Sequence, residues 1–412
     1  HLHINLFDKS GIYLLYLAVS LVPFHFNLAS LPGIAFYREL IAILFIGLII
    51  QKLYKNGILS FSARSEVVLL IIFPILVCVS AIYDPLIDLY QSDIYLNTIT
   101  TSVEGDIDPR IYIIRNAILY LPLVLYFSLR GISRSEISNL SLFLTIVAPF
   151  SILFYLLFAY ESGNFSIFLL GEMAEYGGAN ISYNSYVPYL TFPFLGAIYL
   201  LFTKNNLVIK VICMGSISMM SIFMFLSSSR QSMLFLGIAS LFYFLLDDMT
   251  KFKKILSLSI LSFFILGTYF FLTNDVVLNQ NLIDKYSTGA ETSRFKILVD
   301  GFQLLRFNEL ISGAGLSSVV ISGPHNDYLR WTQRIGVIFM IISFLPFFIS
   351  FLKSFKRTII GENKQEYTLI TLLIFFTIYH SVFGYPREDA YQAIFCFTGL
   401  ALWLGYSRNN LV

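Results

Sequence analysis

Apolar runs of membrane-spanning length recur along almost the whole chain, and this pattern limits the folds available to it. A helix that crosses a bilayer needs about 20 predominantly apolar residues, because the hydrocarbon core is about 30 Å thick. The segment is helical because hydrocarbon offers no partners to backbone polar groups. A window of about 19 residues predicts twelve such segments. They lie at 11–29, 36–53, 66–83, 111–129, 141–160, 185–203, 207–226, 231–246, 254–272, 335–352, 367–384 and 389–406. The sequence therefore predicts an all-α polytopic membrane protein in which residues 1–412 form one integral membrane domain.

The composition agrees with a membrane protein and argues against a metal-dependent or nucleic-acid-binding function. Hydrophobic residues make up 57% of the chain and charged residues only 13%, whereas soluble domains carry roughly 25% charged residues. The sequence has no cysteine–histidine cluster, and no acidic pair beside a histidine matches a metal-ligand template. We therefore expect no metal, no cofactor and no nucleic-acid partner, and an activity that survives chelation.

The positive charges predict the orientation of the chain in the membrane. If the N-terminus is cytoplasmic, all but two of the lysines fall in cytoplasmic segments, as the positive-inside rule requires. The opposite side holds most of the acidic residues. Both termini are therefore predicted to be cytoplasmic, and three long loops are predicted to be periplasmic, at 84–110, 161–184 and 273–334.

The basic residues on the predicted outer side are mainly arginines. Nine arginines and two lysines lie there. The arginines are Arg38, Arg110, Arg115, Arg230, Arg294, Arg306, Arg330, Arg334 and Arg387. A guanidinium is planar and always charged, and it binds phosphate oxygens bidentately, which an ammonium group does not. This set suits a lipid-linked phosphate or pyrophosphate, although pairing with outer acids or lipid headgroups explains individual members equally well.

The third loop carries the strongest motifs. Residues 294–306 place apolar side chains at helical spacing, which predicts an amphipathic helix before the tenth span. Gly313 and Gly315 are expected to supply tight turns ahead of the His-Asn pair at 325–326.

These residues resemble those of the O-antigen polymerase and ligase superfamily (Wzy and WaaL). The resemblance rests on SSSRQS at 227–232, TSRFKILVDGF at 292–302, the glycines of GAG at 313–315, and HNDYL at 325–329 followed by Gly336. The segment NISYNSYVPYL at 180–190 resembles the entrance of the family's middle helix. Together with twelve spans, the resemblance covers most of the chain.

The resemblance implies a metal-independent glycosyltransferase of the bacterial inner membrane, with an active site that faces the periplasm. Its donor would be a sugar chain on undecaprenyl pyrophosphate. Fixed cations stabilise the charge that develops on a pyrophosphate leaving group, and Arg230 and Arg294 are the candidates for this role. An imidazole has a pKa near 6.5 and accepts a proton from an attacking hydroxyl at neutral pH, so His325 is the candidate catalytic base.

Five further residues are candidates for substrate binding. Asn326 either orients the imidazole or caps the helix that follows, and Arg115 either faces the substrate cavity or reaches the outer headgroups. Tyr385 and Arg387 lie in a short outer turn, where Arg387 either completes a phosphate clamp or pairs with a neighbouring acid. Arg306 belongs to the outer arginine set.

Three functions remain open at this point. A polymerase joins the chain to the next lipid-linked repeat unit, whereas a ligase transfers it to a lipid A-core sugar. The Phe-, Ile- and Tyr-rich composition favours the polymerase, with lipid-linked oligosaccharide, membrane lipids and a polysaccharide chain-length regulator as partners. The third function, a transporter or flippase, places its binding site near the bilayer midplane, whereas the ionisable residues here cluster at the outer edge.

Overall fold

The structure is a computed structural model that is almost entirely helical. It describes residues 2–21, 37–56, 64–82, 109–161, 173–176, 179–226, 230–246, 299–316, 326–361, 363–383 and 392–409. The helices are α1 (Leu2–Leu21), α3 (Tyr37–Asn56), α4 (Ser65–Ile82), α6 (Pro109–Ile118), α7 (Leu121–Arg130), α8 (Arg134–Glu161), α9 (Tyr183–Thr203), α10 (Leu207–Leu226), α11 (Arg230–Leu246), α15 (Phe307–Ser312), α16 (Asp327–Ile360), α17 (Lys364–Phe383) and α18 (Gln392–Asn409). Strands β1 (Met173–Tyr176) and β2 (Ala179–Ser182) pair antiparallel.

Each predicted apolar segment overlaps one or two described helices, except for 254–272, which lies outside the described residues, as do 22–29 of the first segment. Within the described ranges, five stretches are long and apolar enough to cross a bilayer. They are Ser65–Ile82, Ile113–Arg130, Arg134–Leu157, Leu207–Met224 and Asp327–Ile360. The chain is therefore a multi-pass helical membrane protein, and twelve crossings stay a prediction.

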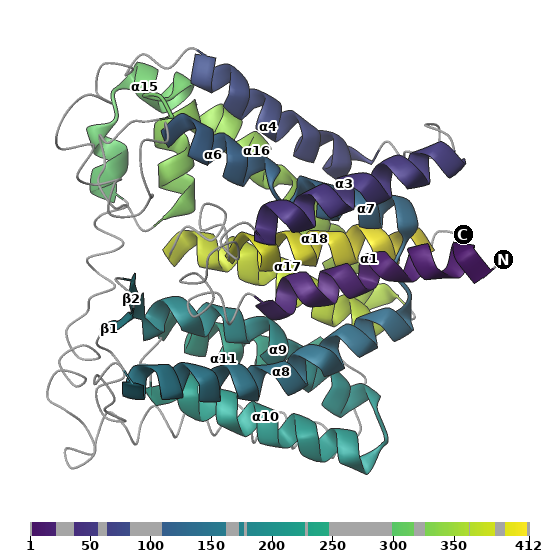
Figure 1. Cartoon of the computed structure of the whole chain (residues 1–412). Coiled ribbons are helices and arrows are strands. Elements are labelled where there is room, and N and C mark those ends of the chain that lie inside the picture. Colours follow the sequence, from purple (N-terminus) through teal and green to yellow (C-terminus); the bar gives the residue numbers. More distant parts are fainter. Residues whose placement is uncertain are drawn as a thin grey trace, which may run out of the picture.

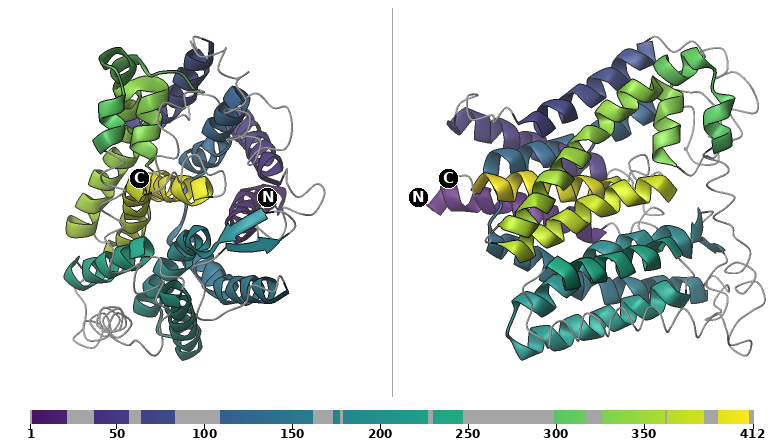
Figure 2. Two further views of the ribbon diagram at one scale, coloured as in Figure 1. Left: turned by 90° about the vertical axis from the view of Figure 1, so that its left-hand side faces the viewer. Right: turned by 180° about the vertical axis from the view of Figure 1, so that it is seen from behind.

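Two helices form the centre of the bundle. Residues 187–202 of α9 and 393–407 of α18 are buried on every side, and the end-on view shows α18 surrounded by other helices (Figure 2). The peripheral helices instead expose apolar side chains such as Leu157, Val208 and Leu352, each more than 60% exposed. A helix that is apolar all round belongs in an interior, and exposed apolar faces of this kind suit contact with lipid.

The two ends of the bundle differ as the charge distribution predicts. Both termini lie at one end, and β1, β2 and α15 lie at the other (Figure 1). Ion pairs join residues predicted on the same side: Arg134 pairs with Glu366 at the end that holds the termini, and Arg115 pairs with Glu39 at the other. The grouping of charges therefore agrees with the predicted topology. The assignment of the two ends to cytoplasm and periplasm stays a prediction.

The structure differs in detail from the predicted boundaries. The fourth predicted span is divided between α6 and α7, because Pro122 lies at the start of α7, where its ring disfavours continuation of the preceding helix. The second predicted loop holds the β1–β2 hairpin, which the sequence analysis did not anticipate. The tenth predicted span begins at 335, whereas α16 begins at Asp327 and is interrupted at Gly336.

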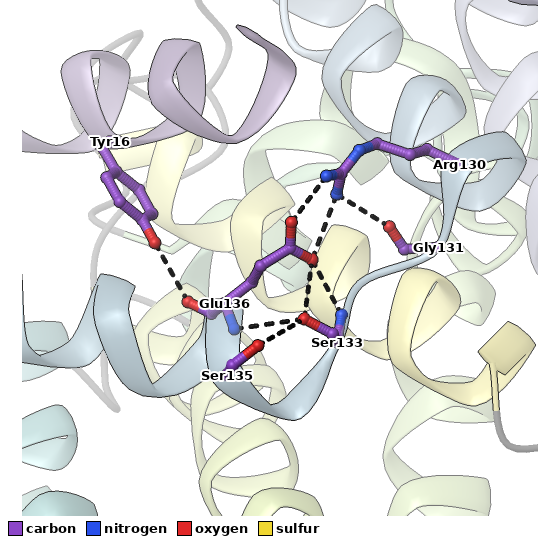
Figure 3. Close-up of polar contacts among 6 residues, drawn as sticks. All are labelled: Tyr16, Arg130, Gly131, Ser133, Ser135 and Glu136. Carbon is purple, nitrogen blue, oxygen red and sulfur yellow. Dashed lines mark hydrogen bonds and ion pairs between the residues drawn. The ribbon is translucent and has the colours of Figure 1, made fainter. Parts of the chain in front are cut away.

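The turn between α7 and α8 shows how the end near the termini is held together (Figure 3). The guanidinium of Arg130 donates to both carboxylate oxygens of Glu136, over 2.6 and 3.2 Å. The same carboxylate accepts from the backbone N–H of Ser133, over 2.9 Å. Tyr16 of α1 donates its hydroxyl proton to the backbone carbonyl of Glu136, over 3.3 Å. One acidic residue thus links three helices.

Replacing Glu136 with alanine is expected to lower the free energy of unfolding by about 2–4 kcal/mol. The reason is that Arg130, whose side chain is 10% exposed, loses its carboxylate partner, and the loss of one member of a buried pair costs about 3–5 kcal/mol. Denaturant unfolding in detergent micelles measures the change. Ser135→Ala in the same turn is the control, because Ser135 is exposed and is expected to change stability by less than about 0.5 kcal/mol. Equal stabilities for the two variants would contradict the assignment.

Candidate functional site

The helix α16 begins at Asp327, two residues after His325, and its cap is well defined. The Oδ1 atom of Asn326 accepts from the backbone N–H of Leu329 over 2.9 Å, and its Nδ2 donates to the carbonyl of Val382 over 2.8 Å. The first bond satisfies a free N–H of the helix terminus. The second fixes the start of α16 against the end of α17. Of the two interpretations of Asn326, the structure therefore shows the helix cap.

Asp327 is a functional candidate that the sequence analysis missed. Its side chain is fully buried, and the hydroxyl of Ser381 on α17 donates to its Oδ2 over 3.5 Å. A buried carboxylate is costly unless it is compensated, and the N-terminus of a helix stabilises negative charge. The sequence offered one signal, the position of this carboxylate immediately after the His-Asn pair, whereas its burial is visible only in the structure. Buried ionisable groups concentrate at functional sites.

Two glycines bring the segment before the His-Asn pair into backbone contact with α16. Gly313 and Gly336 both have φ of 83°. A Cβ atom on Gly336 would collide with the carbonyl of Ile311, and one on Gly313 would collide with the carbonyl of Arg334. The backbone N–H of Ala314 donates to the carbonyl of Gln333 over 2.7 Å. The close approach therefore requires glycine at both positions.

Gly313 and Gly315 both have positive φ, 83° and 109°, which is favourable for glycine in tight turns, and residues 317–325 lie outside the described ranges. The predicted amphipathic helix at 294–306 is described only from 299, where residues 299–304 are helical. Within this stretch Gly301 is buried and Phe302 is half-buried, whereas Val299 and Leu304 are exposed.

The part of α16 that follows the cap is buried and includes polar and charged side chains. Trp331, Thr332, Gln333 and Arg334 are all shielded from solvent, and Arg334 is only 8% exposed. Its guanidinium lies 5.7 Å from the ring centroid of Trp331, a cation–π arrangement. Arg334 therefore packs within the protein, although the sequence analysis counted it only as one of the outer arginines.

Two predicted binding residues, Arg115 and Arg306, make their described contacts with residues other than those of the α16 cap. Arg115 of α6 donates from Nε to Glu39 of α3 over 2.6 Å, so it forms an ion pair with an acid, one of the alternatives expected for the outer arginines. Arg306 is exposed at the start of α15, where its backbone N–H donates to Glu309 over 2.8 Å. Each guanidinium remains partly accessible from outside.

The structure does not describe the side chains of the remaining candidates. Arg230 is the first residue of α11, and its side chain is not described. His325, Arg294, Tyr385 and Arg387 lie outside the described residues. The described part of the site is therefore a rigid platform: a capped helix start, a buried carboxylate and a glycine-mediated crossing.

This platform lies at the end of the bundle opposite the termini, near α15 (Figure 1). Within the described ranges, no three histidine, cysteine, aspartate or glutamate side chains come together as a metal site, and metal independence stays a prediction. No protein-family model matches the chain, and no curated protein sequence is significantly similar to it.

Proposed function

We propose that this protein polymerises lipid-linked polysaccharide repeat units at the periplasmic face of the bacterial inner membrane. The hydroxyl of the incoming lipid-linked repeat attacks the anomeric carbon of the growing chain. A new glycosidic bond forms, the bond to pyrophosphate breaks, and undecaprenyl pyrophosphate leaves. His325 accepts the hydroxyl proton, and Arg230 and Arg294 stabilise the charge on the leaving pyrophosphate.

One observation supports this proposal: Asn326, the second residue of the His-Asn pair, caps α16 at one end of the membrane bundle and is held there by two hydrogen bonds. The bonds from Asn326 to Leu329 and Val382 immobilise the residue next to His325. Catalytic groups need such positioning, because displacement by about 1 Å can cost about 100-fold in rate. A site at the end of a membrane bundle would also give a polar acceptor sugar access that the hydrocarbon region would not.

The outer arginines support a phosphate-bearing substrate. Among those with described side chains, Arg115 is held by a carboxylate and Arg334 is packed on an aromatic ring, whereas Arg306 is exposed. Arg334 lies on α16, the helix that begins with the motif residues. A fixed guanidinium stabilises developing charge better than a mobile one, because it needs no reorganisation during the reaction.

Deletion of the gene in its host tests the proposal against its nearest alternative. Loss of a polymerase is expected to leave lipopolysaccharide that carries the core plus one repeat unit. A bare core would instead indicate the ligase, because no chain would then reach the core. Unchanged long chains would contradict both activities. Complementation with the intact chain, and not with a frameshifted copy, is the control.

A further inference from the structure

A second site lies at the end of the bundle that holds the termini. A pocket of about 540 Å³ opens there between α4, α16, α17 and α18. Four cationic side chains line it, Arg64, Lys353, Lys356 and Arg357, together with the carboxylate of Glu66. A volume of this size is in the range of small-molecule sites, about 300–1,000 Å³. No residue of the proposed active site contributes to it.

The chain builds this pocket from a fixed inner wall. Glu66 is 1% exposed, and its Oε1 accepts from Lys353 over 2.8 Å and from the indole of Trp403 over 3.5 Å. Arg64 donates from Nη1 to the hydroxyl of Ser407 over 2.7 Å and to the carbonyl of Leu404 over 3.1 Å. Glu66 of α4 therefore holds Lys353, and α18 holds Arg64.

The outer wall leaves the other two cations available. Lys353, Lys356 and Arg357 are spaced at i, i+3 and i+4, so they share one face of α16. Lys356 and Arg357 are exposed, and in the described part of the chain no ion pair joins either of them to a carboxylate. Among the described residues that line the pocket, Glu66 is the one acid, and it is already bound by Lys353.

The electrostatics of the pocket favour an anion. Partial burial lowers the pKa of Arg64, and the neighbouring Arg408 lowers it further, whereas Glu66 raises it. Four cationic side chains line the pocket beside the carboxylate of Glu66, so their positive charge exceeds what this carboxylate offsets. An anion bound between Arg64 and the α16 cations would relieve their mutual repulsion. Guanidinium groups favour phosphate among the common anions, because their fork matches its oxygens.

The surroundings of the pocket favour a phosphate that is attached to a lipid. Ile360 lines the pocket and is 73% exposed, and Leu352 and Ile359 expose apolar side chains on the same helix. Basic pockets between membrane helices on the cytoplasmic side bind anionic headgroups while the acyl chains lie along the apolar faces. We propose that this pocket binds the phosphate of an anionic phospholipid headgroup.

Lipid binding to the purified full-length protein tests this proposal. Native mass spectrometry measures binding of phosphatidylglycerol, with phosphatidylcholine as the zwitterionic reference lipid of zero net charge. The double variant Lys356→Ala/Arg357→Ala is expected to bind phosphatidylglycerol about 30-fold more weakly, because each basic residue near an anionic headgroup contributes about 1 kcal/mol. Both side chains are exposed, so the variant should keep the thermal stability of the unmodified protein in detergent.

The matched control is Lys204→Ala/Lys210→Ala, which removes the same charge beside the α9–α10 turn, outside the pocket. It is expected to weaken phosphatidylglycerol binding less than threefold. Equal losses in the two double variants, or no loss in either, would overturn the proposal. A parallel thermal-shift series uses inorganic phosphate alone. Stabilisation by phosphate but not by phosphatidylglycerol, abolished by Lys356→Ala/Arg357→Ala, would assign the pocket to a soluble phosphate compound and overturn the lipid.

Discussion

Replacing His325 with alanine should reduce chain extension by about 100-fold or more, without changing the amount of folded protein. A positioned general base typically contributes about 10²–10⁴-fold to a rate, and the proposed reaction needs a group that accepts the proton of the attacking hydroxyl. Extension is measured with the purified protein in vesicles, from undecaprenyl-pyrophosphate-linked repeats to longer chains separated on a gel.

The same variant separates an enzyme from a transporter. Flipping of the lipid-linked repeat is measured in the same vesicles, and we expect it to be unaffected by His325→Ala. His380→Gln is the matched control: His380 is buried in α17, and its ring stacks on Phe376 with centroids 5.2 Å apart, which is a packing role. Unchanged extension in His325→Ala would remove the catalytic assignment, and loss of flipping alone would favour a transporter.

Much of the helical architecture could be predicted because apolar runs encode it directly. Each helix that crosses a bilayer must make its own backbone hydrogen bonds and match the thickness of the hydrocarbon core. Its length and hydrophobicity therefore appear in the sequence. The division between α6 and α7 was also visible in principle, since Pro122 signals a break. The early start of α16 was visible as well, because Asn326 is a favourable N-cap residue.

Pairings between distant segments could not be predicted from the sequence. Arg115 was expected to face a cavity, to reach the headgroups or to pair with an outer acid, but its partner was not identified: Glu39, 76 positions away, accepts its hydrogen bond. Nothing in the local pattern at either residue identifies the other. The burial of Asp327 has the same origin, because it depends on how the end of α17 packs over the start of α16.

The cationic pocket illustrates a further limit of sequence patterns. The positive-inside rule explains why Lys353, Lys356 and Arg357 occur near the predicted cytoplasmic surface, but it does not distinguish solvated charges from a binding site. The distinction comes from Arg64 and Glu66, which precede these residues by almost 300 positions and complete the wall of the pocket.

The glycine crossing leads to the largest expected effect on folding. Gly336 interrupts α16 with φ of 83° and ψ of 161°, a region of backbone conformation that is essentially restricted to glycine and costs other residues about 1–3 kcal/mol. A methyl group there would also meet the carbonyl of Ile311, and overpacking of this kind costs about 1–3 kcal/mol more. Gly336→Ala is therefore expected to lower the free energy of unfolding by about 3–5 kcal/mol, which is most of the stability of a marginally stable protein.

Size-exclusion profiles in detergent and thermal unfolding measure this effect. The controls are Gly47→Ala in α3 and Gly215→Ala in α10, because a Cβ atom at either position meets nothing within 4 Å. Both glycines are helical, so alanine is expected to stabilise them by about 0.5–1 kcal/mol. Gly313→Ala is expected to match Gly336→Ala, since its Cβ atom would meet the carbonyl of Arg334 on the other side of the same contact. If both crossing variants unfold like the two controls, the segment before His325 does not contact α16 as described, and the start of α16 is not held by this crossing.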